Sequence, residues 1–174
     1  MRIRIELASL RREREYLEAV RRSRQLHRPW ASPPATPERF RRYIEAMRGP
    51  RSAAYFVLSA AGDLVGAVDI TEIVRGPFRS AYVGYYAFAP HHGRGYMTAG
   101  LAAVVGRAFR KHRVHRLEAN IQPGNVASIA LVKRAGFRRE GYSVRYLKIG
   151  GRWRDHERWA LLADDWHPGR PGAG

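Results

Sequence analysis

The chain has 174 residues, a formal net charge of +17 and no cysteine. This length is typical of one domain, and an apolar content of 45% is enough to fill a core. The lack of cysteine excludes disulfides and thiolate metal sites and favours a reducing compartment, so we expect a cytoplasmic protein. No apolar run matches a signal peptide or a membrane span, and we expect no membrane contact.

The positive charge leaves nucleic-acid binding open as an alternative function. Clustered cations bind phosphates by releasing counterions. Only Lys111, Lys133 and Lys148 of the 32 basic residues are lysine, which indicates an arginine-rich composition rather than a dedicated binding patch. The same field would also attract a polyanionic cofactor.

The N-terminal part predicts a strand, a helix and a loop. Residues 2–7 alternate as in a strand, and Ser9 is placed to cap a helix that runs to about Leu26. Four prolines deny helical hydrogen bonds to residues 28–37, so this segment is a loop. We expect Trp30 to fill the core from it.

A second helix is expected at residues 37–48, where Thr36 is the N-cap, Pro37 the first helical residue and Gly49 the end. Beyond it, segments whose apolar residues recur with a period of two alternate with segments of helical spacing. This pattern predicts strands at 53–59, 64–74, 81–89 and 115–121, helices at 96–111 and from Asn125 to Gly136, and a hairpin of 140–149 and 152–162 turned at Gly150-Gly151.

Strands on both sides of the helix at 96–111 imply a crossover and a partly parallel sheet. We therefore predict a mixed α/β (α+β) fold, with residues 1–166 as a single domain. Residues 167–174 have no core-forming pattern and are predicted to be a flexible C-terminal tail.

The stretch HHGRGYMTAG, residues 91–100, joins a predicted strand to a predicted helix. Gly93 and Gly95 would let a ligand approach the backbone, and the N–H groups at a helix N-terminus favour phosphate. The stretch matches neither the Walker pattern nor the dinucleotide fingerprint. The alternative is a glycine turn that only changes the direction of the chain.

Two segments carry a family resemblance. YYAFAPHHGRGYMTAGL, followed about thirty residues later by IQPGNVASIALVKRAGF, resembles the GNAT acetyltransferase superfamily. The segments SRQLHRPW, IVRGPFRSAYVGY, YLKIGGRWRDHERWALL and DWHPGR resemble the branch that contains ribosomal-protein-alanine N-acetyltransferases of the RimJ/RimL type. The resemblance covers nearly the whole chain.

The resemblance implies the GNAT fold: a mixed, mostly antiparallel sheet of six to seven strands flanked by about four helices. It also implies acetyl-CoA as co-substrate and no metal. The residues expected to hold acetyl-CoA are Phe88, Ala89, His92, Gly93, Arg94, Gly95, Tyr96, Met97, Thr98, Asn125 and Ser128.

The family's loop pattern, Gln/Arg-x-x-Gly-x-Gly/Ala, falls on His92, Gly95 and Met97, and two of these positions depart from it. Backbone N–H donation does not depend on either side chain, so the cofactor prediction is kept. Arg94 and Arg107 are expected to add charge for the phosphates.

For the chemistry, the resemblance implies that the amine attacks the thioester directly and that a backbone N–H polarises the acetyl carbonyl. That N–H is expected near Phe88 or Ala89. Many relatives protonate the thiolate with a tyrosine, whose place here holds Val132, whereas the RimJ/RimL branch has a serine, here Ser128. The alternative for Ser128 is a hydrogen bond to its own helix backbone.

Glu118 is the predicted general base, because it alternates with its neighbours and points to the opposite face of its strand. Asp69, Glu72 and Glu140 are rivals, and the alternative for each carboxylate, which is the more frequent one, is a surface pair with one of the many arginines. No glutamate lies at residues 144–146, the place expected from RimL, which favours deprotonation through water.

Ionisation favours an α-amine as acceptor. An α-amino group titrates near 7.7–8.0 and lysine near 10.4, so neutralising lysine costs roughly 3.5 kcal/mol more. The predicted function is acetylation of the N-terminal α-amine of a protein such as a ribosomal protein, with possible ribosome association, by a monomer or homodimer. The alternatives are acetylation of a small amine (an antibiotic, a polyamine or an amino acid) or a non-catalytic basic RNA-binding module.

Overall fold

The computed structural model describes residues 2–167. The strands are β1 (Ile3–Leu7), β2 (Ala53–Ser59), β3 (Leu64–Thr71), β4 (Ser80–Ala87), β5 (Arg116–Ile121), β6 (Arg138–Ile149) and β7 (Arg152–Leu162). The α-helices are α1 (Glu13–Arg22), α2 (Arg24–His27), α3 (Pro37–Ala46), α4 (Tyr96–Arg110) and α5 (Val126–Arg134), and two 3₁₀ helices cover Leu10–Arg12 and Ala163–Asp165.

The seven strands form one sheet in the order β1-β2-β3-β4-β5-β7-β6. β4 and β5 pair in parallel, and the other neighbouring strands are antiparallel. The predicted mixed, mostly antiparallel sheet is therefore confirmed. The crossover through α4 explains the parallel pair, because the chain must return to the same end of the sheet before it can pair that way.

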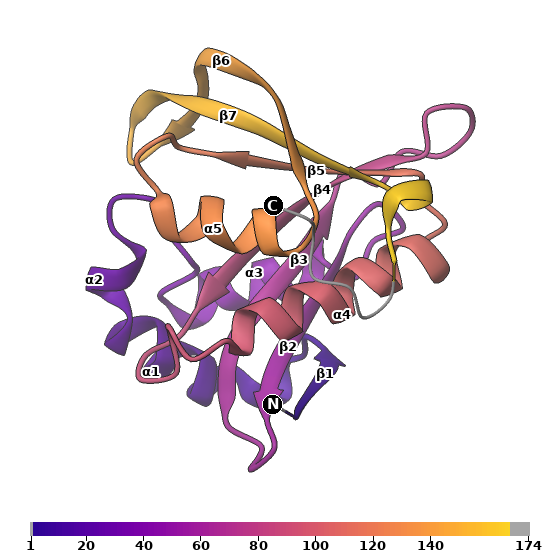
Figure 1. The fold of residues 1–174 in the computed structure, drawn as a ribbon. Helices are drawn as coiled ribbons and strands as arrows, with labels where there is room; N and C mark the ends of the chain where they lie inside the picture. Colours follow the sequence, from indigo (N-terminus) through magenta and orange to yellow (C-terminus); the bar gives the residue numbers. More distant parts are fainter. Residues whose placement is uncertain (1, 168–174) are drawn as a thin grey trace.

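Helices α4 and α5 cover one face of the sheet, and α1, α2 and α3 lie on the other (Figure 1). Each face has its own apolar cluster. Leu101, Val104 and Ala108 of α4 are fully buried, as the helical spacing of these apolar residues predicted. On the opposite face, Tyr16 of α1 and Phe40 of α3 pack together with ring centroids 4.6 Å apart.

Two glycines let α4 lie unusually close to the sheet. A Cβ atom at Gly66 of β3 would stand 2.1 Å from Met97 Sδ, and one at Gly100 would stand 2.6 Å from a methyl carbon of Val57. Larger residues at these positions would push the helix outward. The close contact therefore fixes the first turns of α4 relative to β3.

The long helix predicted from Ser9 to Leu26 is wrong in detail. It is divided into a 3₁₀ turn, α1 and α2, and Ser9 makes no side-chain cap. The division falls at Ser23, whose Oγ donates to Ala19 O at 2.7 Å and accepts the N–H of Ala89 at 2.9 Å. A tertiary contact thus overrides the helical pattern there.

Some predicted boundaries also move. β3 ends at Thr71 because Glu72 has a positive φ of 49°, and β4 ends at Ala87 rather than at residue 89. Trp30 does not fill the core: it is half-buried, and its ring lies against Gly124 in the turn before α5. The glycine turn between β6 and β7 is confirmed, with positive φ at both Gly150 and Gly151.

Within residues 2–167, none of the helices is both long and apolar enough to cross a membrane. The flexible tail predicted from residue 167 falls, from residue 168 onward, outside the residues that the structure describes.

Candidate active site

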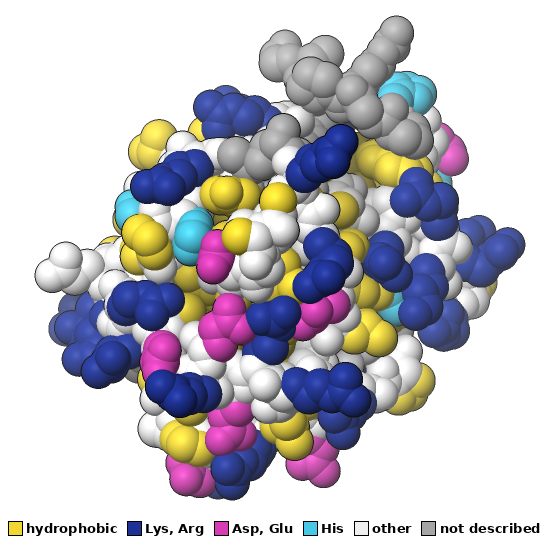
Figure 2. Space-filling model, turned by 90° about the horizontal axis from the view of Figure 1, so that it is seen from below, with side chains coloured by type: hydrophobic (Ala, Val, Ile, Leu, Met, Phe, Trp, Pro, Cys, Tyr) yellow, Lys and Arg dark blue, Asp and Glu magenta, His cyan; other side chains and the backbone are white. Residues whose placement is uncertain are grey.

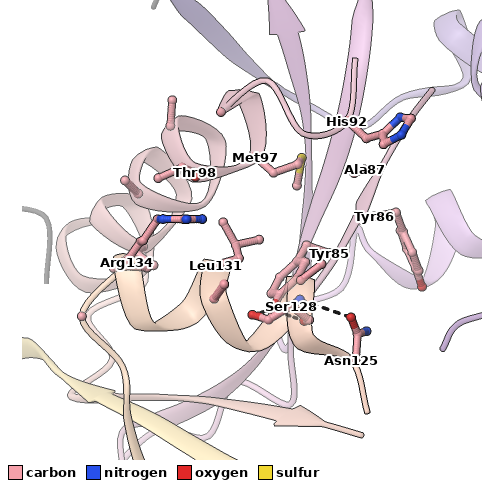
Figure 3. Close-up of a pocket in the computed structure, with 18 of the residues that line it drawn as sticks. Tyr85, Tyr86, Ala87, His92, Met97, Thr98, Asn125, Ser128, Leu131 and Arg134 are labelled. Atoms are coloured by element: carbon pink, nitrogen blue, oxygen red, sulfur yellow. Dashed lines mark hydrogen bonds between the residues drawn. The ribbon is translucent and has the colours of Figure 1, made fainter. Parts of the chain in front are cut away.

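A cavity of about 1400 Å³ runs between α4, α5 and the end of β4, and reaches α2. Its residues come from segments far apart in the sequence: His27 and Trp30 near α2, Tyr85 and Tyr86 on β4, the glycine stretch, and α5. In Figure 3, Tyr85 points from β4 toward Ser128 of α5, whereas Tyr86 points away from that helix. The cavity therefore gives access to both sides of β4.

The glycine stretch forms the wall of the cavity at the N-terminus of α4. Gly93 and Gly95 have φ of 74° and 82°, which only glycine adopts without strain, and Gly95 is the N-cap residue of α4. A Cβ at Gly93 would meet nothing within 4 Å, so the space beside this backbone is open. A bent backbone with free space at the positive end of a 15-residue helix is suited to a phosphate.

The other residues of this stretch divide into two groups. His92, Met97 and Thr98 line the cavity. Met97 is only 8% exposed, because its side chain also packs on β3. Arg94 is exposed, and Tyr96 packs edge-on against His91 with ring centroids 5.8 Å apart. The side chains of Arg94 and Tyr96 are not among those that line the cavity.

β4 and β5 separate next to this turn. Their pairing covers only Ser80–Tyr82 with Arg116–Glu118. Beyond Tyr82 the two strands part, and the cavity reaches the residues of β4 that follow, Tyr85, Tyr86 and Ala87. A chain-like ligand that enters from the α4 side can therefore pass between the strands.

Asn125 and Ser128 stand at the start of α5, where the sequence predicted the cap. Asn125 Oδ1 accepts the backbone N–H of Ser128 at 3.2 Å, so the predicted capping role is confirmed. Ser128 Oγ shares a hydrogen bond of 2.5 Å with Tyr85 Oη from β4 (Figure 3). Burial raises the pKa of Tyr85 to about 12, so its hydroxyl is protonated at neutral pH. This gives a Tyr-Ser pair of O–H groups inside the cavity.

A strand that parts from its parallel neighbour, a glycine turn at a helix N-terminus and a polar pair between them occur together here. A family model described as an acetyltransferase (GNAT) domain matches residues 4–138. The chain belongs to the GNAT acetyltransferases. It is 40% identical over 121 residues to the [ribosomal protein uS5]-alanine N-acetyltransferase of Escherichia coli strain K12, a match that covers 68% of this chain and 62% of that protein.

Solved structures agree with this assignment. Mycobacterium smegmatis RimJ in complex with CoA-disulfide superimposes with a TM-score of 0.86 at 26% identity, covering 93% of this chain and 82% of that one. The spermidine N-acetyltransferase from Vibrio cholerae, in complex with CoA and spermine, has a TM-score of 0.80 at 19% identity, covering 94% of this chain and 96% of that one. The second likeness concerns the fold alone. This chain is thus an N-acetyltransferase of the GNAT fold.

In this GNAT chain, the backbone N–H groups expected to polarise a carbonyl are already in use. The N–H of Phe88 donates to Val65 O at 3.0 Å, and that of Ala89 donates to Ser23 Oγ at 2.9 Å. Phe88 is also fully buried in the cluster beneath α1 and α3. Because alternate residues of a strand point their N–H groups to opposite sides, the N–H of Ala87 points toward the gap beside β5.

His27, which sequence analysis did not select, fixes the same part of β4. Its Nε2 donates to Ala87 O at 2.9 Å, and burial lowers the pKa of the imidazole, so the ring is neutral at pH 7. The carbonyl of Ala87 is thereby held on the α2 side. This contact could not be predicted from a local sequence pattern, because His27 and Ala87 are 60 residues apart.

The cationic side chains in the cavity differ from those expected. Arg107 stacks over the ring of Tyr55 at 5.6 Å and does not line the cavity. Arg134 of α5 does line it, and in Figure 3 it extends toward Thr98 of α4. Arg134 could not be selected from the sequence, because only the packing of α5 beside α4 brings it near the glycine turn.

The candidate general bases have different environments. Glu118 Oε1 accepts Arg116 Nε at 2.7 Å, and the same arginine also pairs with Glu140. Glu72 is exposed and pairs with Arg51, which precedes β2. Asp69 differs from all three: it is buried, and none of the ion pairs found within residues 2–167 includes it.

Asp69 instead accepts a hydrogen bond from Tyr43 Oη at 2.5 Å. Burial raises the pKa of this carboxyl to about 7, although the Tyr43 hydrogen bond acts in the opposite direction. Among the described residues there is no cluster of three or more His, Cys, Asp or Glu that would hold a metal ion. Asp69 is not among the residues that line the cavity; it lies beneath Tyr43 and close to Tyr86, which does line it.

We predict that Asp69→Asn stabilises the fold at neutral pH and not in acid. The native pKa of Asp69 is higher than the value of 3.8 in the unfolded chain, so the wild-type protein loses stability as the pH rises from about 4 to about 7. The amide keeps an acceptor for Tyr43 but does not ionise. Urea unfolding at pH 8 should show the variant to be more stable by on the order of a few kcal/mol, with the gain vanishing near pH 4.

A gain in stability that is the same at pH 4.5 and pH 8 would contradict this assignment of the carboxyl group. Asp63→Asn is the matched control. Asp63 is exposed in the turn between β2 and β3, and its change should leave the pH dependence of unfolding as in the wild-type chain.

Proposed function

We propose that this chain transfers the acetyl group of acetyl-CoA to the N-terminal α-amine of a protein, such as a ribosomal protein. The observation that carries the proposal is the continuous cavity that begins at the glycine turn of α4 and passes the Tyr85–Ser128 pair. The relative from Escherichia coli supports the acceptor class, since it is named for the alanine of a ribosomal protein. We also expect this acceptor to be met in the cytoplasm.

Backbone amides of residues 93–98 would hold the diphosphate of acetyl-CoA. They stand at the N-terminus of α4, and their positive potential does not depend on the side chains at 92 and 97. Arg134 would add a cation from α5. The pantetheine arm would then run past Asn125 toward the gap between β4 and β5.

Two groups would act on the thioester. The N–H of Ala87 faces the gap and is placed to donate to the acetyl carbonyl oxygen as negative charge develops there. The Tyr85–Ser128 pair would supply a proton to the sulfur that leaves. Ser128 reaches the sulfur and Tyr85 keeps its hydroxyl oriented, which gives Ser128 the acid role that the family resemblance implied.

The alternatives differ in the acceptor that is acetylated and in how RNA affinity depends on salt concentration. A small amine, such as a polyamine, would use the same transfer groups and differ only in the acceptor site. A basic RNA-binding module would need a continuous cationic surface, but Figure 2 shows Lys and Arg spread over the visible face with Asp and Glu among them. The mixed charge of this face does not support a dedicated RNA-binding surface there.

A panel of acceptors tests the function. With saturating acetyl-CoA at pH 7.5, we expect a peptide with a free N-terminal alanine to be acetylated on the order of a hundred-fold faster than an N-blocked peptide with one lysine, because fewer lysine amines are neutral. Mass spectrometry of the products measures both rates. Preference for spermidine would favour the small-amine alternative, and RNA affinity that falls steeply with salt, without acetyl-CoA binding, would favour the RNA-binding module.

The glycine turn can be tested by binding alone. Gly95→Ala should weaken acetyl-CoA binding about tenfold or more, because the left-handed φ of 82° costs a non-glycine residue about 1–3 kcal/mol and the turn will shift to relieve it. Isothermal titration calorimetry gives the affinity. Gly76→Ala is the control, since Gly76 has φ of 71° in the β3–β4 loop, away from the cavity. Equal affinities of the two variants would remove the turn from the phosphate site.

Ser128→Ala should lower kcat by about a hundred-fold, which is typical of losing a general acid, and leave acetyl-CoA affinity nearly unchanged. Tyr85→Phe should lower kcat less, and the double variant should be no worse than Ser128→Ala, because the two hydroxyls act as one unit. Stopped-flow measurement of thiol release separates kcat from binding. Ser143→Ala, on β6 and outside the cavity, is the control. Wild-type kcat in Ser128→Ala would contradict the assignment.

A further inference from the structure

A row of polar positions crosses four strands on the sheet face opposite α4 and α5. Asp69 of β3 lies directly across from Gly84 of β4, and Asn120 of β5 lies directly across from Arg158 of β7. Tyr82 pairs with Glu118, so two residues further along each parallel strand Gly84 and Asn120 flank the gap between β4 and β5. Residues directly opposite each other share a face of the sheet, so the row is continuous.

There is open space in the middle of this row. Gly84 is exposed, and a Cβ atom built on it would meet nothing within 4 Å. The neighbouring side chains are therefore not packed over it. The space lies beside the point where β4 and β5 part, and so at the mouth of the passage that the thioester would occupy.

A buried polar atom beside this space lacks a partner. Asn120 Oδ1 has no hydrogen-bond partner in the part of the chain that is described. Arg158 Nε, at the far end of the row, also lacks one there, and its guanidinium group lies against Gly141 of β6. The hydroxyl of Tyr16, which is buried near Asp69, also lacks a hydrogen-bond partner among the described residues. Buried polar groups without partners are rare in folded proteins, and their hydrogen bonding is commonly completed by a water, an ion or a ligand.

Asp69 is the carboxylate of this row, and it lacks a cation. Three phenols lie near it, Tyr43 from α3, Tyr16 from α1 and Tyr86 from β4, and none of the ion pairs within residues 2–167 includes it. This is unusual in a chain with 32 Lys and Arg and only 15 Asp and Glu. A buried anion among neutral phenols is suited to a cation that comes from outside the chain.

Building on the proposed function, we propose that the acceptor amine binds over Gly84 and that Asp69 holds its ammonium group and takes a proton from it. Asn120 is then a positioning residue, whose Oδ1 accepts a hydrogen bond from the bound amine or from the next amide. Asp69 and Gly84 have Cα atoms about 5.5 Å apart as a hydrogen-bonded antiparallel pair. The carboxylate is thus within reach of an amine placed at the gap.

The proton balance is complete. The ammonium nitrogen gives one proton to the Asp69 carboxylate, and its free lone pair forms the bond to the acetyl carbon. The carbon–sulfur bond breaks, and its electron pair leaves with the sulfur, which takes a proton from the Tyr85–Ser128 pair. The nitrogen loses a second proton to that pair through water, and Asp69 releases its own to solvent.

The ionisation of Asp69 fits this task. Burial raises its pKa to about 7, close to the 7.7–8.0 of an α-amine, so transfer of the proton is nearly balanced in energy. Glu118, on the same face, is held by Arg116 at 2.7 Å and stands where β4 and β5 are still paired. The structure thus favours Asp69 over Glu118 as the proton acceptor.

Kinetics over pH 6.5–9.5, with a peptide bearing a free N-terminal alanine as probe, test this inference. Asp69→Asn should lower kcat/KM about a hundred-fold at pH 7, and the loss should shrink by pH 9.5, where the amine is neutral without help. Acetyl-CoA affinity should not change, and Asp63→Asn should behave as wild type. A loss that is constant with pH, or a pH-dependent loss in Glu118→Gln instead, would overturn the proposal.

Gly84→Val gives a second, independent readout. Its side chain would enter only the open space over β4, so the variant should fold and bind acetyl-CoA normally. Its KM for the peptide, and the Kd of the peptide for the CoA-loaded protein measured by calorimetry, should rise tenfold or more. Unchanged values would overturn the proposed acceptor position.

The two proposals fail in different ways. Acetyl-CoA binding and turnover by the unaltered chain report on the proposed function. Differences among the variants report on Asp69 and Gly84, and peptide binding to the CoA-loaded protein does so even without turnover. Spermidine, used as a second probe, should show the same losses in Asp69→Asn and Gly84→Val if it is the better acceptor.

Discussion

The separation of β4 from β5 is the constraint on which the site depends. Three hydrogen bonds fix the end of β4: the N–H of Phe88 donates to Val65 O on β3, the N–H of Ala89 donates to Ser23 Oγ, and the carbonyl of Ala87 accepts from His27 at the end of α2. None of these three partners lies on β5, with which β4 pairs only as far as Tyr82. The passage between the strands is therefore a built feature, and the interruption of the first long helix at Ser23 is part of how it is made.

The close packing of α4 places the other half of the site. Gly66 and Gly100 allow the helix to approach the sheet, and Met97 fills the space over β3. The N-terminus of α4 is thus fixed next to the point where β4 and β5 part. In the proposed function, the glycine turn would hold the phosphates and the gap would hold the thioester, and acetyl-CoA is a chain-like molecule that carries both groups.

Charge is arranged differently on the surface and in the site. Most of the carboxylates that the sequence offered as bases are neutralised by nearby arginines, as in the contacts of Arg116 with Glu118 and Glu140. The Arg116–Glu118 pair is partly buried, and in both contacts the guanidinium group of Arg116 occupies the carboxylate that a general base would need. Asp69 does not pair with an arginine of the described chain, because α1 and α3 cover it with aromatic rings. Its pKa is raised by burial.

The sequence by itself determined the parts that depend on near neighbours. The glycine turn at 93–95, the Asn125 cap and most of the order of strands and helices follow from local backbone preferences and periodicity, and they suffice to predict a mixed α/β sheet. The GNAT fold and a candidate phosphate site were predicted from the family resemblance of the quoted segments. The tertiary structure alone decided which groups already have partners: the acceptors of the Phe88 and Ala89 amides, the hydrogen bond of Tyr85 with Ser128, and the burial of Asp69 without an ion pair to any described residue. These contacts join residues up to 66 positions apart, and their hydrogen bonds and burial depend on packing that no local pattern records.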